Sequence, residues 1–290
     1  MKLHINRRNA LVLAASLVFA PAAQADSPSR VIAAGGSVAE IIHALGAGDR
    51  LIARDTTSTY PAEVEALPDI GYVRALSAEN LIAMDPDMII AEHDAGPPEV
   101  LEVLQRTGIP LVMVPQALDP DGVAAKIAAV AGALDLPEAG QALQDSVAAK
   151  LEEARIAGAA LPETPRVMFI LSMQGGRLMV GGTGTSAEAM IELAGGVNAV
   201  AGLDGYKPLT DEAAIAAAPD LILMMDRGGD HEVSVADIAA HPALRLTSAG
   251  AEGRVITMDG LYLLGFGPRT GDAALELTAQ FRRLPEWADG

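Results

Sequence analysis

A degenerate internal repeat constrains the fold of this chain more than any other feature of the sequence. The segment 71–79 (GYVRALSAE) returns as 205–212 (GYKPLTDE), and each copy is followed at the same spacing by a Pro-Asp pair and an apolar run, at 86–90 and at 219–223. The two copies lie much further apart than the repeats of a solenoid, whose period is about 20–50 residues. The repeat therefore predicts two similar lobes that face each other across a ligand cleft.

Both halves of the chain alternate short apolar runs with helical patterns, which is typical of a parallel sheet covered by helices on both faces. We predict two Rossmann-like α/β lobes, each with a mostly parallel sheet. The expected strands are 31–34, 51–53, 88–91 and 111–114 in the first half and 167–171, 178–180, 221–225 and 255–258 in the second. The expected helices within the lobes are 38–45, 77–84, 98–106 and 271–284.

One long amphipathic helix is predicted between the two halves. Apolar residues from Leu143 to Ala154 recur at the 3.6-residue spacing of a helix, and charged residues occupy the opposite face. We expect this backbone helix, at 136–161, to join a first lobe at 26–135 to a second lobe at 162–290.

The first helix of each lobe is expected to begin with a capping box, in which a Ser or Thr and a Glu three residues later cap the helix reciprocally. Ser37 with Glu40, and Thr185 with Glu188, have this spacing. The two lobes are therefore predicted to start their first helices in the same way.

Residues 1–25 have the pattern of a removable export signal. A basic start is followed by an apolar run, and Ala23-Gln24-Ala25 forms a small-residue cleavage site before Asp26. The apolar run is too short to span a bilayer, and no later segment has about 18 continuous apolar residues. We predict cleavage near Ala25/Asp26, export to the periplasm, and no insertion of the mature chain into a membrane.

The composition disfavours several classes of partner and chemistry. The chain has a formal net charge of −18, and removal of the basic signal would make it more negative. Such a charge disfavours nucleic acids and anionic membrane surfaces. The chain has no cysteine, so it has neither disulfides nor thiolate metal sites nor a cysteine for a lipid anchor.

The repeat, the long linking helix and the segments 55–61 (DTTSTYP) and 67–79 (LPDIGYVRALSAE) resemble the periplasmic binding proteins of ABC importers, in the class that serves haem, vitamin B12 and siderophores. The resemblance covers essentially all of the mature sequence, and the two segments are similar to those of the haem-binding subgroup. It implies a monomer that binds haem as its transported ligand, without a free metal ion. It also implies delivery of haem to a dimeric inner-membrane ABC permease, with an outer-membrane haem receptor upstream.

In the haem-binding subgroup the tyrosine of the Gly-Tyr-x-Arg segment is the axial ligand of the haem iron, which implies this role for Tyr72. A phenolate oxygen is a hard ligand for ferric iron, and tyrosine ligation of haem occurs in catalase. Because a free phenol ionises only near pH ~10, it needs help to lose its proton at neutral pH. Arg74 can help by placing a guanidinium beside the phenol oxygen. The alternative is that Tyr72 is an amphipathic lid residue and that Arg74 pairs with a surface carboxylate.

Further residues are candidates for haem contacts because they lie near the ends of predicted strands or within the second copy of the repeat. A guanidinium there could bind a haem propionate, and a histidine could supply a second ligand or a hydrogen bond. For each of the histidines, including His241, a solvated position in a loop is the expected state. The candidates are Arg227, Tyr206, Lys207, Met173, His93, His231 and Tyr262.

Some members of the haem-binding subgroup carry a second-lobe histidine just before a Gly-Gly pair. The matching segment here, 172–176 (SMQGG), has no histidine. This departure argues against ligation of haem iron through that segment, and against a second haem held there.

Glu79 and Glu212 occupy equivalent positions of the repeat, each near the start of a predicted helix. A carboxylate near a helix N-terminus is favoured by the helix dipole, by about 0.3–1 kcal/mol, which is the structural alternative. In this importer class a glutamate at the matching place on each lobe docks into arginine pockets of the permease. The resemblance therefore implies that Glu79 and Glu212 dock on the two subunits of a dimeric permease.

No motif indicates catalysis, since the chain lacks a Gly-x-Ser-x-Gly elbow, a Gly-x4-Gly-Lys loop and a nucleophilic cysteine. A periplasmic hydrolase that uses the cleft remains the alternative from another class of protein. Vitamin B12 or a ferric siderophore remains the alternative cargo for a binding protein. The single tryptophan, Trp287, lies at the C-terminus, which disfavours a siderophore site lined by tryptophans.

Overall fold

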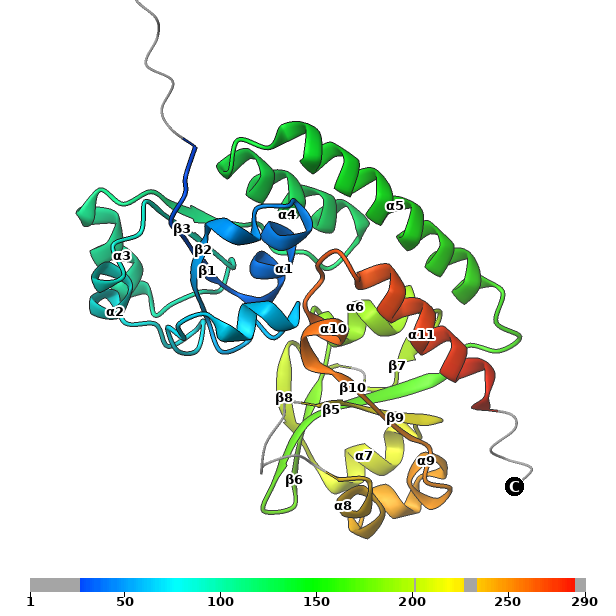
Figure 1. Ribbon diagram of the computed structural model, residues 1–290. Helices are drawn as coiled ribbons and strands as arrows, with labels where there is room; N and C mark the ends of the chain where they lie inside the picture. The colour runs from blue at the N-terminus through cyan, green and yellow to red at the C-terminus, as the bar shows by residue number, and fades with distance from the viewer. Residues whose placement is uncertain (1–26, 201, 227–233, 285–290) are drawn as a thin grey trace, which may run out of the picture.

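The computed structural model describes residues 27–200, 202–226 and 234–284, which form two α/β lobes joined by a long helix (Figure 1). The predicted signal peptide and three residues named above, Arg227, His231 and Trp287, lie outside the described residues. Within the described ranges, every helix is too short or too polar to cross a membrane.

The first lobe contains a four-stranded parallel sheet in the order β2-β1-β3-β4. The predicted strands of this lobe are confirmed to within one residue. The strands are β1 (Val31–Ala34), β2 (Leu51–Arg54), β3 (Met88–Ala91) and β4 (Leu111–Met113). The helices are α1 (Gly36–Ala44), η1 (Gly48–Arg50), η2 (Ala62–Ala66), α2 (Ala78–Ala83), α3 (Pro98–Thr107) and α4 (Pro120–Ala133).

Both faces of the first sheet are covered, as the buried runs of its strands predict. Successive side chains of a strand point to opposite faces. Val31 and Ala33 of β1 accordingly pack in a core that includes α1 and α4, whereas Ile32 and Ala34 pack in a core that includes residues of α2 and α3. The α1 and α4 core continues into the second lobe, so the two lobes share one apolar interior.

The second lobe contains a mixed sheet in the order β10-β9-β5-β6-β8, with β7 paired to β5. Strands β5, β7, β9 and β10 run parallel, whereas β6 and β8 are antiparallel to their neighbours. The strands are β5 (Arg166–Gln174), β6 (Arg177–Gly181), β7 (Val197–Asn198), β8 (Tyr206–Leu209), β9 (Leu221–Asp226) and β10 (Val255–Asp259). The helices are α6 (Ser186–Leu193), α7 (Asp211–Ala217), α8 (Val235–Ala240), η3 (Leu244–Leu246), α9 (Ser248–Ala251), α10 (Gly260–Leu264) and α11 (Thr270–Arg282).

The antiparallel part of this sheet arises from a tight hairpin between β5 and β6. Gly175 and Gly176 at its turn have φ angles of 57° and 76°, values that favour glycine. Positive φ at both central residues of a two-residue turn matches the right-handed twist of the strands on either side. The antiparallel pair lets β8 add to the sheet beyond β6, so the second copy of the repeat becomes a strand.

The two copies of the sequence repeat therefore have the same structure only in part. Tyr206 lies in the edge strand β8, whereas Tyr72 lies in a loop. The equivalence returns at the helix that follows, because Ser77 caps α2 and Thr210 caps α7 with the same side-chain hydrogen bond. The structural difference between the two copies therefore lies in the segment that contains Tyr72 in the first copy and Tyr206 in the second.

The predicted linking helix is α5 (Pro137–Ala159), whose 23 residues correspond to a length of about 35 Å. It runs along the outside of both lobes next to α4 and α11 (Figure 1). Val147 and Leu151 of α5 share a core with Leu277 and Phe281 of α11. The apolar stripe predicted for this helix thus attaches it to both lobes along its length.

The capping box predicted for Ser37 and Glu40 is wrong. The helix α1 begins after Gly35, without a side-chain cap. Glu40 accepts two hydrogen bonds from Arg269 of the second lobe instead, both of 3.0 Å. Thr185 does cap α6 by accepting the N–H of Glu188, but the Glu188 carboxylate accepts from Gly184.

Two cations hold the lobes together at the amino end of α1. Arg269 lies just before α11 and forms the pair with Glu40, whose side chain is 5% exposed. Lys126 of α4 donates to the carbonyl of Gly265 in the second lobe at 3.2 Å. A side chain at Gly36 would collide with the Leu261 side chain of α10, so Leu261 of the second lobe packs directly against the Gly36 backbone of the first. These contacts set the relative position of the lobes.

Replacing Arg269 by Ala should lower the free energy of unfolding by about 3 kcal/mol, because it leaves the buried Glu40 carboxylate without its cation. Urea denaturation monitored by circular dichroism measures the effect. Arg155→Ala is the control, since it removes a pair with Glu152 in which both partners are exposed. If Arg269→Ala and Arg155→Ala lost the same stability, the Arg269–Glu40 pair would be unimportant. Adding Glu40→Gln to Arg269→Ala should recover part of the lost stability, because it removes the unpaired buried charge.

Candidate ligand-binding site

Tyr72 is presented by a loop whose other residues are anchored in the first lobe. Ile70, Val73 and Leu76 are buried in the core that covers one face of the first sheet, whereas Tyr72 is 42% exposed. The alternation of buried and exposed side chains along the loop leaves Tyr72 and Arg74 on its outer side. A loop anchored in this way holds an exposed phenol at a defined place.

The backbone of the loop is tied to the ends of two strands. The carbonyl of Gly71 accepts the N–H of Thr56, which follows β2, and the carbonyl of Val73 accepts the N–H of Gly96, which follows β3. Tyr72 therefore lies at the carboxyl ends of the parallel strands. Ligands of open α/β sheets bind at this edge.

Arg74 connects the Tyr72 phenol to a carboxylate. Its Nη1 donates to the Tyr72 hydroxyl oxygen, and its Nε donates to Asp94 Oδ2 at 2.7 Å. The Nη2 atom donates to the same carboxylate oxygen. The structure thus brings together the two residues that the motif predicts, and it also pairs Arg74 with a carboxylate, Asp94, as the alternative interpretation of the motif expected. The signal for Asp94 was its position after β3, the same signal that pointed to its neighbour His93.

The electrostatics of this triad keep Arg74 charged. Burial disfavours the guanidinium cation and lowers the pKa of Arg74, but the hydrogen bond and charge of Asp94, and then the contact with Tyr72, outweigh burial and raise the pKa above its usual value. A permanent cation is therefore held against the Tyr72 phenol oxygen. Because Asp94 binds two nitrogens of Arg74, Nη1 remains available for the Tyr72 oxygen.

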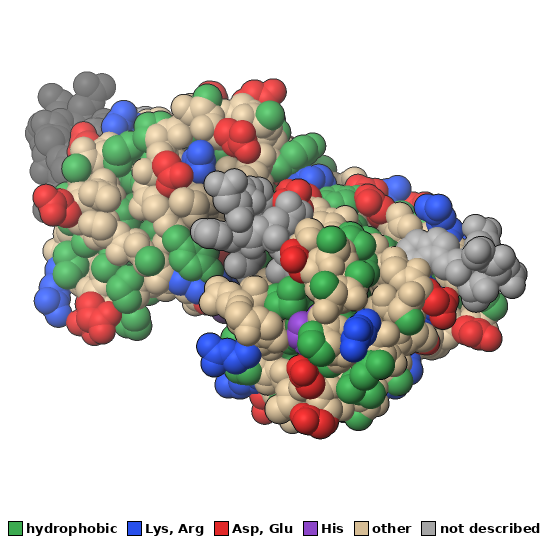
Figure 2. All heavy atoms as spheres, turned by 90° about the horizontal axis from the view of Figure 1, so that it is seen from below, with side chains coloured by type: hydrophobic (Ala, Val, Ile, Leu, Met, Phe, Trp, Pro, Cys, Tyr) green, Lys and Arg blue, Asp and Glu red, His purple; other side chains and the backbone are tan. Residues whose placement is uncertain are grey.

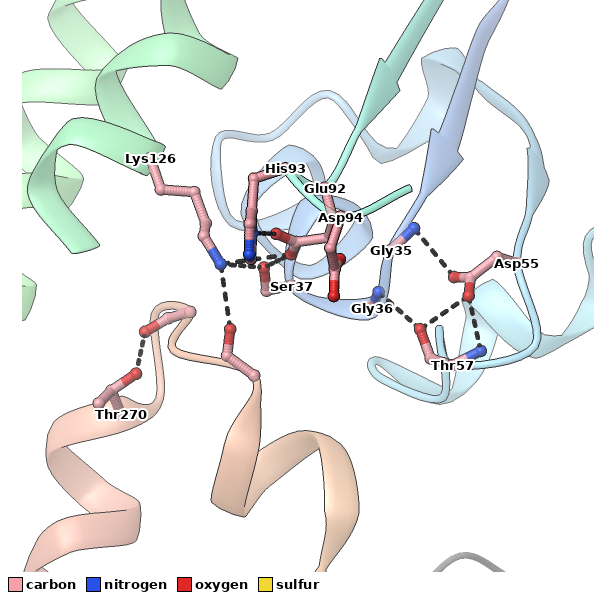
Figure 3. Close-up of polar contacts among 12 residues, drawn as sticks. Gly35, Gly36, Ser37, Asp55, Thr57, Glu92, His93, Asp94, Lys126 and Thr270 are labelled. Atoms are coloured by element: carbon pink, nitrogen blue, oxygen red, sulfur yellow. Dashed lines mark hydrogen bonds and ion pairs between the residues drawn. The ribbon is translucent and has the colours of Figure 1, made fainter. Parts of the chain in front are cut away.

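A second polar cluster lies at the junction of the lobes (Figure 3). The Lys126 ammonium donates to Ser37 Oγ at 2.9 Å and to Glu92 Oε1 at 3.3 Å, and the Ser37 hydroxyl donates to the same Glu92 oxygen. Burial raises the pKa of Glu92, but contacts with His93, Lys126 and Ser37 outweigh burial and leave the pKa below its usual value. Glu92 is therefore an anion in the folded protein.

Tyr262 is held in a stack that spans the two lobes. The guanidinium carbon of Arg269 lies 3.6 Å from the centre of the Tyr60 ring and 5.0 Å from the centre of the Tyr262 ring. Burial, followed by the charges of Glu276 and Asp272, raises the pKa of Tyr262 to about 12. Tyr262 is therefore a neutral phenol near neutral pH, which suits packing or hydrogen bonding to a ligand better than ligation of a metal.

Three other candidates belong to the second sheet. Tyr206 and Lys207 are exposed on β8, and the Tyr206 ring packs edge-on against Phe169 with a centroid distance of 6.3 Å. Met173 of β5 is half-buried and packs against the core on one face of that sheet. Their predicted contacts with haem remain predictions.

The histidines have different environments. His93 is exposed after β3, with its Nδ1 at 3.9 Å from Glu92 Oε2, and it remains a candidate for a ligand contact. The expectation of a solvated His241 is wrong, because this residue is 4% exposed. Its Nδ1 accepts the N–H groups of Ala243 and Leu244, so its Nε2 carries the proton that is donated to the carbonyl of Gly176 at 2.9 Å. His241 thus ties the β5–β6 turn to the end of α8.

Glu79 and Glu212 occupy the same position in their helices. Glu79 is the second residue of α2 and Glu212 is the second residue of α7, and both are exposed. The equivalence of their helical positions, which the sequence repeat predicts, is confirmed.

Among the residues that the structure describes, no group of three or more His, Asp or Glu side chains is placed to hold a metal ion.

The chain belongs to the periplasmic binding protein family, whose model matches residues 31–262. The predicted resemblance is thereby confirmed at the level of the family, which is one of binding proteins. The vitamin B12-binding protein of Vibrio campbellii is 32% identical over 145 residues, which are 50% of this chain and 52% of that protein. The vitamin B12-binding protein of Yersinia pseudotuberculosis serotype O:1b is 35% identical over 36% of each chain. The match thus spans only about a third to a half of the length of these curated relatives.

Solved structures match over nearly the full described chain. The apo form of the periplasmic haem-binding protein RhuT from Roseiflexus sp. RS-1 has a TM-score of 0.85 and 38% identity, over 88% of this chain and 98% of that chain. The periplasmic haem-binding protein BhuT in complex with two haems has a TM-score of 0.83 and 41% identity over the same shares. A periplasmic haem-binding protein from Pseudomonas aeruginosa has a TM-score of 0.81 and 31% identity, over 88% and 93%.

Replacing Lys126 by Met should destabilise the fold most near pH ~7, where Glu92 is an anion. A carboxyl whose pKa is lowered by folding contributes stability above its unfolded pKa, and this contribution is lost as the pH falls through the folded pKa. Lys126→Met removes the cation that stabilises the Glu92 carboxylate. The difference in unfolding free energy between wild type and variant should therefore shrink as the pH is lowered towards about 4.

Urea denaturation at several pH values measures this difference. Lys150→Met is the matched control, because the contact of Lys150 with Glu153 is exposed and should contribute little at any pH. A difference between wild type and Lys126→Met that stays constant with pH would show that Glu92 does not depend on the Lys126 charge.

Proposed function

We propose that this chain binds ferric haem in the periplasm through the Tyr72 phenolate and delivers it to an inner-membrane ABC permease. The observation that carries the proposal is the hydrogen bond from Arg74 to the Tyr72 hydroxyl oxygen. An exposed phenol on an anchored loop thus has a permanent cation in hydrogen-bond contact with its oxygen. Ferric haem offers a hard metal centre to such an oxygen.

The comparisons support haem as the ligand. The three solved structures described above are named as haem-binding proteins, and their identities of 31–41% extend over most of this chain. The chain is strongly acidic, with a net charge of −18, so haem propionates need cations placed locally. Lys207 is an exposed cation of the second lobe that could meet them, and Arg227 remains the other candidate.

Vitamin B12 is the second candidate ligand, because the curated relatives that match part of the chain are named as vitamin B12-binding proteins. Cobalamin carries its own lower axial base and does not call for a phenolate from the protein. Parallel titrations with haemin and with cyanocobalamin, followed by absorption spectroscopy, separate the two ligands. The haemin titration also gives the number of haems bound per chain.

Replacing Tyr72 by Phe should reduce affinity for ferric haem by more than about 100-fold. Loss of a group that only supports a metal ligand costs about 10–100-fold in affinity, and this substitution removes the proposed ligand itself while keeping the ring. Titration of the apo protein with haemin measures the effect. Tyr60→Phe is the control, because Tyr60 is an exposed tyrosine of the same lobe and its ring can still stack on Arg269. Equal affinity of Tyr72→Phe and wild type would place the ligand elsewhere, with His93 as the next candidate.

Docking on the permease is proposed to use Glu79 and Glu212. The two carboxylates lie at equivalent, exposed positions on the two lobes, which suits the two equivalent subunits of a dimeric permease. Neither glutamate belongs to the Tyr72 loop or the Arg74–Asp94 contact.

Glu79→Ala and Glu212→Ala should therefore leave haem binding unchanged but reduce stimulation of the importer's ATPase in reconstituted vesicles. The charge-reversal variants to Lys should be more impaired than the Ala variants, because they would place like charges opposite the expected arginines. The double variant should be the most impaired. Full haem transport by the double variant would remove the docking role and leave these residues as helix-end carboxylates.

A further inference from the structure

The two lobes expose an isoleucine at the same place beside each of these glutamates. Ile82 follows Glu79 by three residues in α2, and Ile215 follows Glu212 by three residues in α7. Residues three apart in a helix lie on the same face. Ile82 is 38% exposed and Ile215 is 39% exposed, which is nearly the same extent.

The surrounding positions of the two helices also match. Ser77 and Thr210 cap them by accepting the N–H of the third helical residue, at 3.4 and 3.3 Å. The fourth helical residue, Leu81 in one and Ala214 in the other, is fully buried. Each helix is therefore seated by one buried side chain and directs a carboxylate and an isoleucine outward from the same turn.

The two helices lie on the side of the molecule away from α5 (Figure 1). Acidic and hydrophobic side chains lie next to one another on both lobes in the view from below (Figure 2). We name the pair Glu79 and Ile82 the first docking patch, and the pair Glu212 and Ile215 the second docking patch. Isolated exposed apolar residues are common on proteins, but an exposed apolar residue repeated at the same helical position of two lobes needs an explanation.

We propose that each docking patch is a combined contact, in which the isoleucine enters an apolar depression of one permease subunit while the glutamate meets a cation beside it. The inference rests on the proposed delivery of ligand to a dimeric permease and adds Ile82 and Ile215 to the surface it uses. Charge and symmetry point to this partner. A carboxylate that is covered at an interface is stabilised by a cation of the partner, and two equivalent patches fit a partner with two equivalent subunits.

The isoleucine increases what the charge pair can contribute to the affinity for the permease. An ion pair at an exposed rim is weakened by solvent, whereas apolar contacts around a polar anchor exclude water and strengthen it. An exposed aliphatic side chain also gains free energy when a partner covers it. The two parts of a docking patch therefore support each other, and neither needs the ligand site.

The test uses the full-length, haem-loaded chain and its importer in lipid nanodiscs, with the concentration for half-maximal ATPase stimulation as the readout. Ile82→Ala and Ile215→Ala should each raise this concentration about 5-fold, and the double variant about 25-fold, because distant contacts add in free energy. Ile156→Ala is the matched control, since Ile156 is 56% exposed on the outer helix α5. It should behave as wild type. The absorption spectrum of each variant confirms that its haem content is unchanged.

Different results distinguish the two levels of the proposal. If the isoleucine variants behave as Ile156→Ala while Glu79→Ala and Glu212→Ala are impaired, the apolar part is overturned and docking through the glutamates stands. If the glutamate variants and the isoleucine variants all behave as wild type, the docking face itself is overturned. An effect of Ile82→Ala without an effect of Ile215→Ala would contradict two equivalent patches.

Discussion

The pair between Arg269 and Glu40 is the interaction on which the arrangement of the lobes depends. Glu40 belongs to the first helix of the first lobe and is 5% exposed, so it requires a permanent cation, which the second lobe supplies. Lys126 adds a second contact in the opposite direction by binding the carbonyl of Gly265. The outer helix α5 attaches to both lobes through a shared apolar core. The carboxyl ends of the first sheet are thereby held against the second lobe.

The Tyr72 site depends on contacts within the first lobe. The loop is anchored by buried apolar residues and by backbone hydrogen bonds to the ends of β2 and β3, so the phenol needs little ordering when a ligand binds. Arg74 is oriented in turn by Asp94, which holds two of its nitrogens and leaves the third for the Tyr72 oxygen. A preorganised oxygen beside a fixed cation is well suited to capture a ferric centre.

Features encoded locally or by the repeat could be predicted from the sequence, whereas long-range pairings could not. The strands of the first lobe, the helix α5 and the equivalent positions of Glu79 and Glu212 follow from local pattern and from the repeat. The helix α4 was not predicted, because its alanines and glycines show little contrast between faces. The capping box at Ser37 failed because the partner of Glu40 lies 229 residues away in the chain. A carboxylate partner for Arg74 was foreseen as an alternative, but its identity as Asp94 was not, since only folding brings Asp94 to Arg74.

The central claim is that the Tyr72 oxygen, as phenolate, binds the iron of ferric haem. Resonance Raman spectroscopy of the haem-loaded wild-type protein, prepared with and without ring-deuterated tyrosine, tests it most directly. Excitation in the phenolate-to-iron charge-transfer band should enhance ring vibrations of a bound tyrosinate, and these should shift on deuteration. A spectrum without tyrosinate vibrations, unchanged by deuterated tyrosine, would contradict the account.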